Sequence, residues 1–290
     1  VGGGNFASSM ANISFFYPKS RQGYALGMNA GLGNLGVSAT QFVIPAVIGL
    51  GLFGALAGDS QTTNEGKTIW LQNAGFIWIP FIAVSAVAAW FGMNDLDAAR
   101  SGFAEQSTIF RRKHNWLMCW LYVGTFGSFI GFSAGFPMLA KTLFPEVVVL
   151  KFAFLGPLVG ALARSAGGAL ADKVGGARLT LLVFAGMVAA VFGVLAFLPS
   201  STSPGSFAGF LSMFLVLFVL SGIGNASTFR MIPVIFRSFH ERRSAGGDAS
   251  ARAAASRQAG IESAAAIGFA SAIGAYGGFF IPKSFGSLLA

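Results

Sequence analysis

Long apolar runs recur along the chain, each close to the roughly 20 residues that a helix needs to cross the hydrocarbon core of a membrane. The eight segments are Gly2–Phe16, Tyr24–Phe53, Ile69–Met93, Trp116–Ala140, Phe152–Ala171, Leu179–Leu198, Phe207–Phe229 and Ile261–Ile281. Only 10% of the 290 residues are charged, whereas a soluble globular chain carries roughly a quarter. We therefore expect an all-α membrane protein with eight transmembrane helices rather than a soluble protein with a large core.

Lysine and arginine residues concentrate in alternate loops between these segments. One side holds Lys19, Arg21, Arg100, Arg111, Arg112, Lys113, Lys173, Arg178, Arg237, Arg242, Arg243, Arg252 and Arg257. The other side holds Lys67, Lys141, Lys151 and Lys283. The positive-inside rule makes the richer side cytoplasmic. This predicts a multi-pass protein of the inner (cytoplasmic) membrane, in a lipid bilayer, and it explains the net charge of +9 without a nucleic-acid partner.

Residues that usually carry catalysis or bind metals are sparse. The single cysteine, Cys119, falls inside a span, and both histidines, His114 and His240, fall in segments that we interpret as cytoplasmic loops. No cluster of metal ligands, nucleophile–base set or phosphate-binding loop is present in the sequence. We therefore expect a protein that is not an enzyme and needs no cofactor. Separately, we expect a monomer. The long polar segment Arg237–Ala259 reads as a flexible loop, because it is rich in Ala, Ser, Gly and Arg.

The chain contains an internal repeat. GNFASSM (4–10) matches GNASTFR (224–230), and each copy closes an apolar span that enters the basic side. Each is followed by a basic loop and then by a helix of small residues, Gly27–Gly36 or Gly268–Gly278. The two copies have the same direction in the membrane, as parallel repeats about an axis along the membrane normal would have. The chain is therefore expected to contain parts of two related halves.

The loop GALADKVGGAR (168–178) resembles the cytoplasmic loop motif of the major facilitator superfamily. In that superfamily the loop joins the second and third helices of each six-helix half. The resemblance implies that the eight spans correspond to helices four to eleven of twelve. Residues 1–93 would then be the remainder of the N-terminal half (helices 4–6), 94–115 a cytoplasmic linker, and 116–290 the C-terminal half (helices 7–11).

A more specific resemblance, to a single family, covers nearly the whole chain. NFASSMANISFFYPK (5–19) and ALGMNAGLGNLG (25–36) are very similar to the nitrate/nitrite porter family. AAAIGFASAIGAYGG (264–278) is similar to the matching signature of that family, and FGSFIGFSAGF (126–136) and GALARSAGG (160–168) also resemble it. The resemblance implies a carrier whose partners are the nitrate and nitrite anions. Members of this family exchange nitrate for nitrite or import nitrate with protons.

When the family resemblance is set aside, Arg164 is still the most informative single residue. It lies eight residues before Asp172, hence about 12 Å along the helix from the basic edge. An arginine at the centre of a bilayer costs at least roughly 2.5–3.5 kcal/mol. The visible spans contain no deep Asp or Glu, since even Glu262 lies at a span edge. A mobile oxyanion suits the planar fork of guanidinium; the alternative is a structural arginine bonded to backbone carbonyls or to an acid elsewhere. Arg230, at the end of its span, is expected to reach cytoplasmic water.

The remaining site residues follow from the resemblance. Tyr122 and Phe126 are four residues apart and share a helix face. The substrate-binding residues implied together with Arg164 are Tyr122, Phe126, Phe6, Asn34, Ser271 and Asn29. Phe6 and Phe126 would flank the planar anion, while Tyr122, Asn34 and Ser271 would donate hydrogen bonds. Because the face of an aromatic ring repels an anion, attraction is left to arginine and to these donors.

These observations predict a carrier that works by alternating access and exchanges nitrate for nitrite. Proton coupling usually needs an intramembrane Asp, Glu or His, and the visible spans offer none at depth. The alternatives are a proton-coupled nitrate importer, a nitrate-specific channel, and a membrane nitrate sensor whose output is the segment Arg237–Ala259.

Overall fold

The computed structural model describes the chain except for residues 1–8, 11, 14–15, 94–100 and 290. Seven helical segments in the described part are long and apolar enough to cross a membrane. They are Gln22–Val47, Asn73–Gly92, Lys113–Leu143, Leu150–Val174, Gly176–Ala196, Phe207–Arg243 and Ala249–Ser287. The expectation of an all-α membrane protein is confirmed. Most of the first expected span, Gly2–Phe16, lies outside the described residues.

The elements have the following bounds. The long helices are α2 (Gln22–Val47), α4 (Ile79–Gly92), α6 (Lys113–Tyr122), α7 (Ser128–Leu143), α9 (Leu155–Val174), α10 (Gly176–Ala196), α11 (Phe207–Arg243), α12 (Ala249–Ala275) and α13 (Gly277–Leu289). The short helices are η1 (Lys19–Arg21), η2 (Gly54–Ala57), α3 (Asn73–Phe76), α5 (Phe103–Gln106), η4 (Ser107–Arg111), η5 (Val123–Gly127) and α8 (Leu150–Ala153). Strands β1 (Gln61–Thr62) and β2 (Thr68–Ile69) pair antiparallel in the loop before α3.

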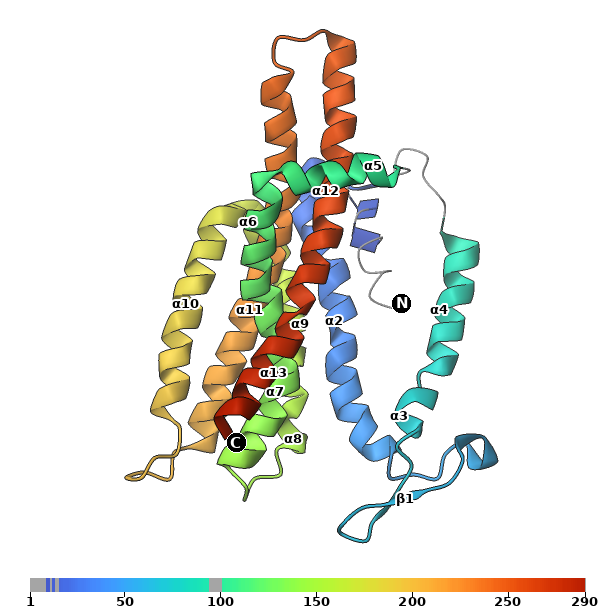
Figure 1. Cartoon of the computed structure of the whole chain (residues 1–290), viewed down its shortest axis with the longest axis vertical. Coiled ribbons are helices and arrows are strands. Elements are labelled where there is room, and N and C mark those ends of the chain that lie inside the picture. The colour runs from blue at the N-terminus through green and yellow to red at the C-terminus, as the bar shows by residue number, and fades with distance from the viewer. Residues whose placement is uncertain (1–8, 11, 14–15, 94–100, 290) are drawn as a thin grey trace.

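The long helices lie side by side along the long axis of the molecule (Figure 1). Helix α4 stands at the edge of the bundle, and none of its residues is buried by the described chain. The end of α11 and the start of α12 project together beyond the other helices. We call this feature, residues 237–259, the projecting hairpin. The prediction of a flexible loop over Arg237–Ala259 is therefore wrong.

Local sequence explains why the projecting hairpin is helical. Alanine, which dominates the start of α12, has the highest intrinsic helix propensity. Asp248 caps this helix, since its Oδ1 accepts a hydrogen bond of 2.8 Å from the backbone N–H of Ala251. An aspartate in this position satisfies one of the amide donors that a helix start leaves without an intrahelical partner.

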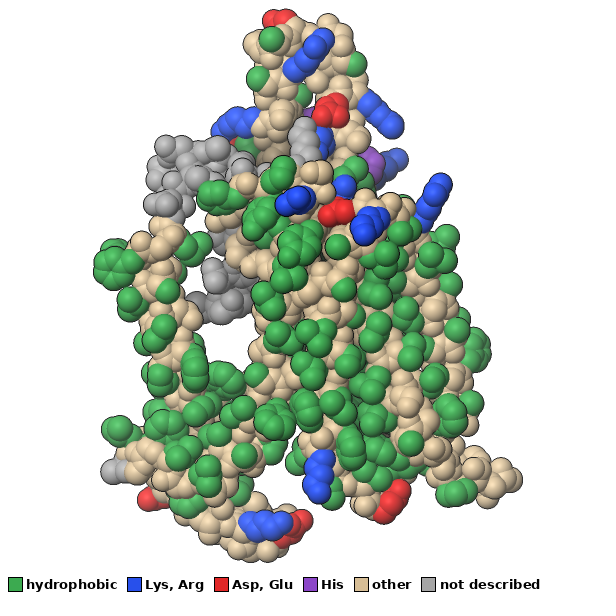
Figure 2. Space-filling view, turned by 180° about the vertical axis from the view of Figure 1, so that it is seen from behind, with side chains coloured by type: hydrophobic (Ala, Val, Ile, Leu, Met, Phe, Trp, Pro, Cys, Tyr) green, Lys and Arg blue, Asp and Glu red, His purple; other side chains and the backbone are tan. Residues whose placement is uncertain are grey.

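The surface has the pattern of a protein embedded in lipid. Apolar side chains cover the middle of the molecule, whereas lysine, arginine, aspartate and glutamate gather at its two ends (Figure 2). Large apolar side chains face outward along whole helices, among them Leu181 and Phe192 of α10 and Trp90 and Phe91 of α4. Such a surface would be exposed to water in a soluble protein, but lipid hydrocarbon is as apolar as these side chains.

Three helices around the centre approach one another closely at glycine residues. A Cβ atom at Gly168 of α9 would overlap the backbone carbonyl of Gly23 of α2. A Cβ atom at Gly222 of α11 would overlap the carbonyl of Gly160 of α9. Small residues allow this backbone contact between membrane helices. As a result α9 lies between α2 and α11, and its central residue, Arg164, is fully buried.

Candidate functional site

Arg164 lies at the centre of the described bundle. Its side chain is fully buried, and it is the largest side chain in the described part of the protein to be so. The Nη2 atom donates a hydrogen bond of 2.9 Å to the hydroxyl of Tyr122, which is also fully buried. Burying a guanidinium costs a large desolvation free energy, so such a group is retained where it binds something.

Three aromatic rings surround the charged end of Arg164. The guanidinium carbon lies 5.6 Å from the ring centre of Phe126, 5.3 Å from that of Phe229 and 6.0 Å from that of Tyr122. The ring of Tyr122 stacks on Phe126, with centres 5.0 Å apart, and on Phe229, with centres 4.4 Å apart. These rings cover the guanidinium and stabilise the cation by cation–π contact. Sequence reasoning missed Phe229, although it lies within the repeated motif at 224–230.

A π-helical turn positions Phe126. The helical segment from Lys113 to Leu143 is interrupted by η5 (Val123–Gly127), which has the wider π-helical hydrogen bonding. Such single turns often occur at functional sites, because they re-aim side chains within an otherwise regular helix. The α-carbon of Gly277 packs directly against Gly127. Two glycines within five residues were the available signal for this irregularity, and periodicity alone did not reveal it.

Helix α12 contacts the same aromatic side chains through a glycine. A Cβ atom at Gly274 would lie 2.7 Å from the ring of Tyr122 and 3.2 Å from that of Phe126. Ser271 lies one turn earlier and is buried. Its hydroxyl donates a hydrogen bond of 2.7 Å to the carbonyl of Ile267 in its own helix. Ser271 thus sits near the cluster, but its hydroxyl would have to rotate to donate to a ligand.

The two predicted asparagines lie on different faces of α2. Asn34 is buried on the face that carries Gly27 and Gly31, which pack against α9, and its Nδ2 has no hydrogen-bond partner among the described residues. Asn29 is exposed on another face and donates hydrogen bonds to Ser9 Oγ (3.1 Å) and Met10 Sδ (3.2 Å). The described structure therefore brings Arg164, Tyr122 and Phe126 together, with Ser271 and Asn34 on adjoining helix faces, and leaves Asn29 outside. Phe6 lies outside the described residues.

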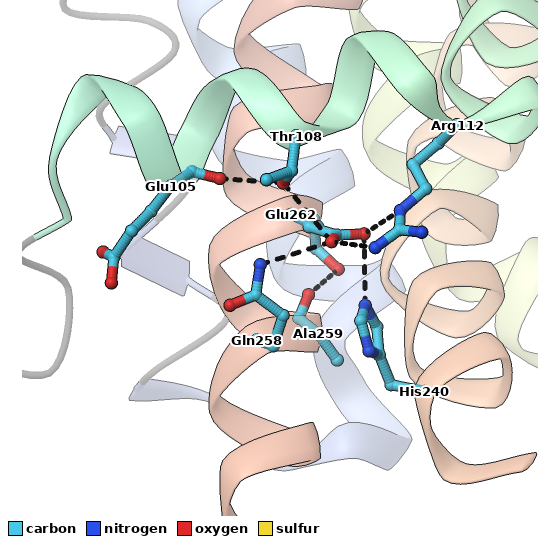
Figure 3. Close-up of polar contacts among 8 residues, drawn as sticks. Glu105, Thr108, Arg112, His240, Gln258, Ala259 and Glu262 are labelled. Atoms are coloured by element: carbon cyan, nitrogen blue, oxygen red, sulfur yellow. Dashed lines mark hydrogen bonds and ion pairs between the residues drawn. The ribbon is translucent and has the colours of Figure 1, made fainter. Parts of the chain in front are cut away.

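A second polar cluster lies at the base of the projecting hairpin (Figure 3). Glu262 of α12 is fully buried, and its carboxylate accepts hydrogen bonds from Arg112, from Gln258 and, at 3.3 Å, from the hydroxyl of Thr108. His240 of α11 places its Nε2 atom 3.1 Å from Glu262 Oε2. The prediction that His240 lies in a loop is therefore wrong, because α11 continues through it to Arg243.

A third contact joins α2, α9 and α11 at the same end. Arg230 Nε forms an ion pair with Asp172 Oδ1, and Asp172 Oδ2 accepts a hydrogen bond of 2.9 Å from the backbone N–H of Tyr24. The side chain of Arg230 is largely buried, so it does not simply extend into water as we expected. Opposite charge within the loop motif, rather than solvent, holds this arginine.

The chemistry available around Arg164 is that of an anion site. A permanently charged guanidinium is combined with a phenolic hydroxyl and aromatic walls. The described residues contain no group of three His, Cys, Asp or Glu side chains that could hold a metal ion. Together, the long apolar helices and this centre define a multi-pass α-helical membrane protein with a buried cationic site.

The chain is similar to membrane proteins that are named as transporters. It is 52% identical to the nitrate/nitrite transporter NarU of Salmonella typhimurium and 51% identical to NarU of Escherichia coli, in each case over 99% of this chain and 62% of the relative. It is 42% identical to a probable nitrate/nitrite antiporter, NarK2, of Thermus thermophilus, over 96% of this chain and 59% of the relative. The names of these relatives agree with the resemblance to the nitrate/nitrite porter family.

The chain spans about three fifths of the length of these relatives. No family model matches the chain. Each of the three relatives is named for transport and none for catalysis, in agreement with our expectation that the protein is not an enzyme.

Proposed function

We propose that the protein carries nitrate and nitrite across the cytoplasmic membrane by alternating access, and that it works as an exchanger. The observation that carries this proposal is the fully buried Arg164, whose guanidinium lies among three aromatic rings and donates to Tyr122. A planar, forked cation suits a planar oxyanion. The names of the relatives at 42–52% identity support the same substrates.

The proposed binding residues have different roles. Arg164 attracts the anion, Tyr122 and Asn34 donate hydrogen bonds, and Phe126 packs against the plane of the anion, with Phe6 proposed on the other side. Ser271 joins after its hydroxyl rotates away from Ile267. Asn29 is kept only as an outer residue, because its amide is exposed and bonded to Ser9 and Met10.

The proposed transport cycle places this site between two halves that rock against each other. We assign residues 1–93 to the N-terminal half, 94–115 to the linker and 116–290 to the C-terminal half. We propose that the end rich in lysine and arginine, which includes the projecting hairpin, faces the cytoplasm, since basic residues favour that side. We also propose that the protein acts as a monomer.

Exchange follows from the fixed charge of the site. Arginine effectively never deprotonates in proteins. A positive charge that is buried away from water is costly to carry through the closed states of a transport cycle. A bound anion offsets this cost, so reorientation should require bound anion, and each anion that leaves must be replaced.

The test is flux in proteoliposomes. Nitrate entry should be fast when nitrite is inside and very slow in vesicles without internal anion, whether or not a proton gradient is imposed. Saturation and trans-stimulation by nitrite would exclude a channel. Binding of nitrate without any flux would instead favour a sensor, and no response to either anion would reject the proposed substrates.

A proton-coupled importer is the second candidate, and one contact favours it. Glu262 and His240 are titratable, buried and 3.1 Å apart, a kind of pair that can carry a proton. This candidate predicts rapid nitrate uptake into anion-free vesicles, driven by an inward proton gradient and accompanied by internal acidification. The exchange mechanism predicts neither result.

A further inference from the structure

Asn225 of α11 is fully buried, yet neither of its amide atoms has a hydrogen-bond partner among the described residues. The carboxamide has one acceptor oxygen and one NH2 group with two donors. A buried polar group without a partner destabilises the folded state. Such groups are rare, and each calls for a physical reason. One reason is a ligand that the amide contacts when the site is occupied.

The position of Asn225 on α11 relates it to Arg164. Gly222, Asn225 and Phe229 are spaced by three and four residues, so they lie on one face of the helix. A Cβ atom at Gly222 would lie 3.2 Å from the backbone nitrogen of Arg164. The ring of Phe229 lies 5.3 Å from the guanidinium carbon of the same arginine. Asn225 is therefore on the stripe of α11 that follows Arg164 from its backbone to its charged end.

The same face of α11 also carries aromatic rings. Phe218, seven residues before Asn225, packs edge-on against Phe129 with ring centres 5.9 Å apart, and Phe129 stacks on Phe126 at 6.4 Å. These rings supply no strong hydrogen-bonding group to the amide. The buried hydroxyls one turn away, Ser221 and Thr228, donate to carbonyls of α11 itself rather than to the amide of Asn225.

We propose that Asn225 contacts the anion held by Arg164, with its Nδ2 group donating a hydrogen bond to an oxygen of the planar oxyanion. This inference rests on the proposed function and adds a residue from α11 to the site. In the empty state the buried amide lacks a hydrogen-bond partner, which lowers the stability of the folded protein. Anion binding supplies the partner and removes this penalty. The side chain thereby couples occupancy of the site to the stability of the bundle.

The chain offers a matched control in Asn115 of α6. It too is fully buried, and both of its amide atoms lack a hydrogen-bond partner among the described residues. It lies seven residues before Tyr122, hence about 10 Å along the helix axis. Asn115→Leu and Asn225→Leu therefore remove the same unsatisfied group from two different places.

The experiment compares nitrate affinity, by calorimetric titration, with melting temperature in the absence of anion, for the full chain purified in detergent. Both leucine variants should melt higher than the wild type without nitrate. Asn225→Leu should bind nitrate about tenfold or more weakly, the loss expected for a hydrogen bond to a charged group, whereas Asn115→Leu should bind normally. A purely structural Asn225 would instead give a lower melting temperature and unchanged affinity, which overturns the proposal.

A second variant keeps the test decisive if Asn225→Leu fails to fold. Asn225→Asp has the same shape and places a carboxylate on the helix face that follows Arg164, so it should raise the melting temperature and abolish nitrate binding. Normal nitrate binding by Asn225→Asp would also overturn the inference. If the wild type binds nitrate and both variants bind as tightly, only this inference fails. If the wild type binds neither nitrate nor nitrite, the proposed function itself is rejected.

Discussion

Arg112 donates hydrogen bonds from Nε and Nη2 to the two carboxylate oxygens of Glu262, at 2.9 Å and 2.6 Å. This paired geometry is the strongest that a guanidinium and a carboxylate form. It fastens the end of η4, in the proposed linker, to the base of the projecting hairpin in α12 (Figure 3). Because Glu262 is fully buried, the contact is far less screened by solvent than an ion pair on the surface.

Replacing Glu262 by glutamine should destabilise the protein. The change leaves the shape of the side chain but removes the charge that Arg112 and His240 face, so we expect a loss of about 2 kcal/mol in the free energy of unfolding. The control is Arg257→Gln, which breaks an exposed contact of 3.7 Å to Glu105 and should change stability by about 0.5 kcal/mol or less. Thermal unfolding in detergent measures both; equal effects would contradict the structural role of Glu262.

Arg164→Lys should remove most nitrate transport while the protein still reaches the membrane. The variant keeps a positive charge but replaces the planar fork with a compact, strongly hydrated ammonium, and we expect at least about a tenfold lower rate. Arg242→Lys, at an exposed residue of the projecting hairpin, serves as the control and should transport normally. Uptake of labelled nitrate, normalised to protein in the membrane, decides the matter. A normal rate for Arg164→Lys would reject its proposed role.

Gly31→Ala should disrupt the contact between α2 and α9. The added Cβ would lie 2.8 Å from the carbonyl oxygen of Ala161 and would overlap the hydroxyl of Ser165. Overpacking of this kind costs about 1–3 kcal/mol. Gly33→Ala lies in the same helix with nothing in the described structure within 4 Å, so it should be neutral or stabilising by up to about 1 kcal/mol. The melting temperature should therefore fall for Gly31→Ala and stay the same or rise for Gly33→Ala.

The cap of α12 should depend on pH. The backbone N–H of Ala251, and next the hydroxyl of Ser250, hold the pKa of the Asp248 carboxyl below its ordinary value. The stabilisation of the first turn is therefore complete above the ordinary carboxyl pKa and is lost as the pH falls through the lowered pKa. Hydrogen exchange in the first turn, corrected for its intrinsic rate, should accelerate over that range.

Two variants separate the cap from other effects of pH on the hairpin. Asp248→Asn keeps a capping oxygen that does not titrate, so exchange should remain slow across the range. Asp248→Ala removes the cap, so exchange should be fast at every pH. If the wild type and Asp248→Asn respond to pH alike, the aspartate is not the titrating group.

The sequence was most informative where composition and local pattern decide the structure. The length of the apolar runs predicted the transmembrane spans, because crossing a bilayer requires a helix of a certain length with mostly apolar side chains. The cost of a buried charge singled out Arg164, and the structure places it beside Tyr122 and Phe126. These are local or single-residue arguments, and they do not depend on knowing which helices are neighbours.

What the sequence did not reveal depends on contacts between distant segments. Phe229 joins the aromatic cluster only because α11 passes Tyr122. The sequence placed Glu262 at the edge of a span and His240 in a loop. Their contact depends on the packing of α11 against α12, which the sequence did not reveal. The projecting hairpin was misread because its polar composition resembles that of a flexible loop, although its alanines favour a helix.

Because the projecting hairpin is long, a small rotation of the helices below it produces a large displacement of its tip. Thirteen residues of α12 precede Glu262, so the tip stands about 20 Å beyond that residue and roughly 35 Å from the centre of the bilayer. If the half of the protein that contains the hairpin tilts by ten degrees, the tip would then move by about 6 Å. A distance measurement between two attached probes resolves a displacement of this size. The chain has one native cysteine, Cys119, which is buried. A thiol introduced at the exposed Ala254 would therefore take a label selectively and amplify a small rotation at Arg164 into a readable signal.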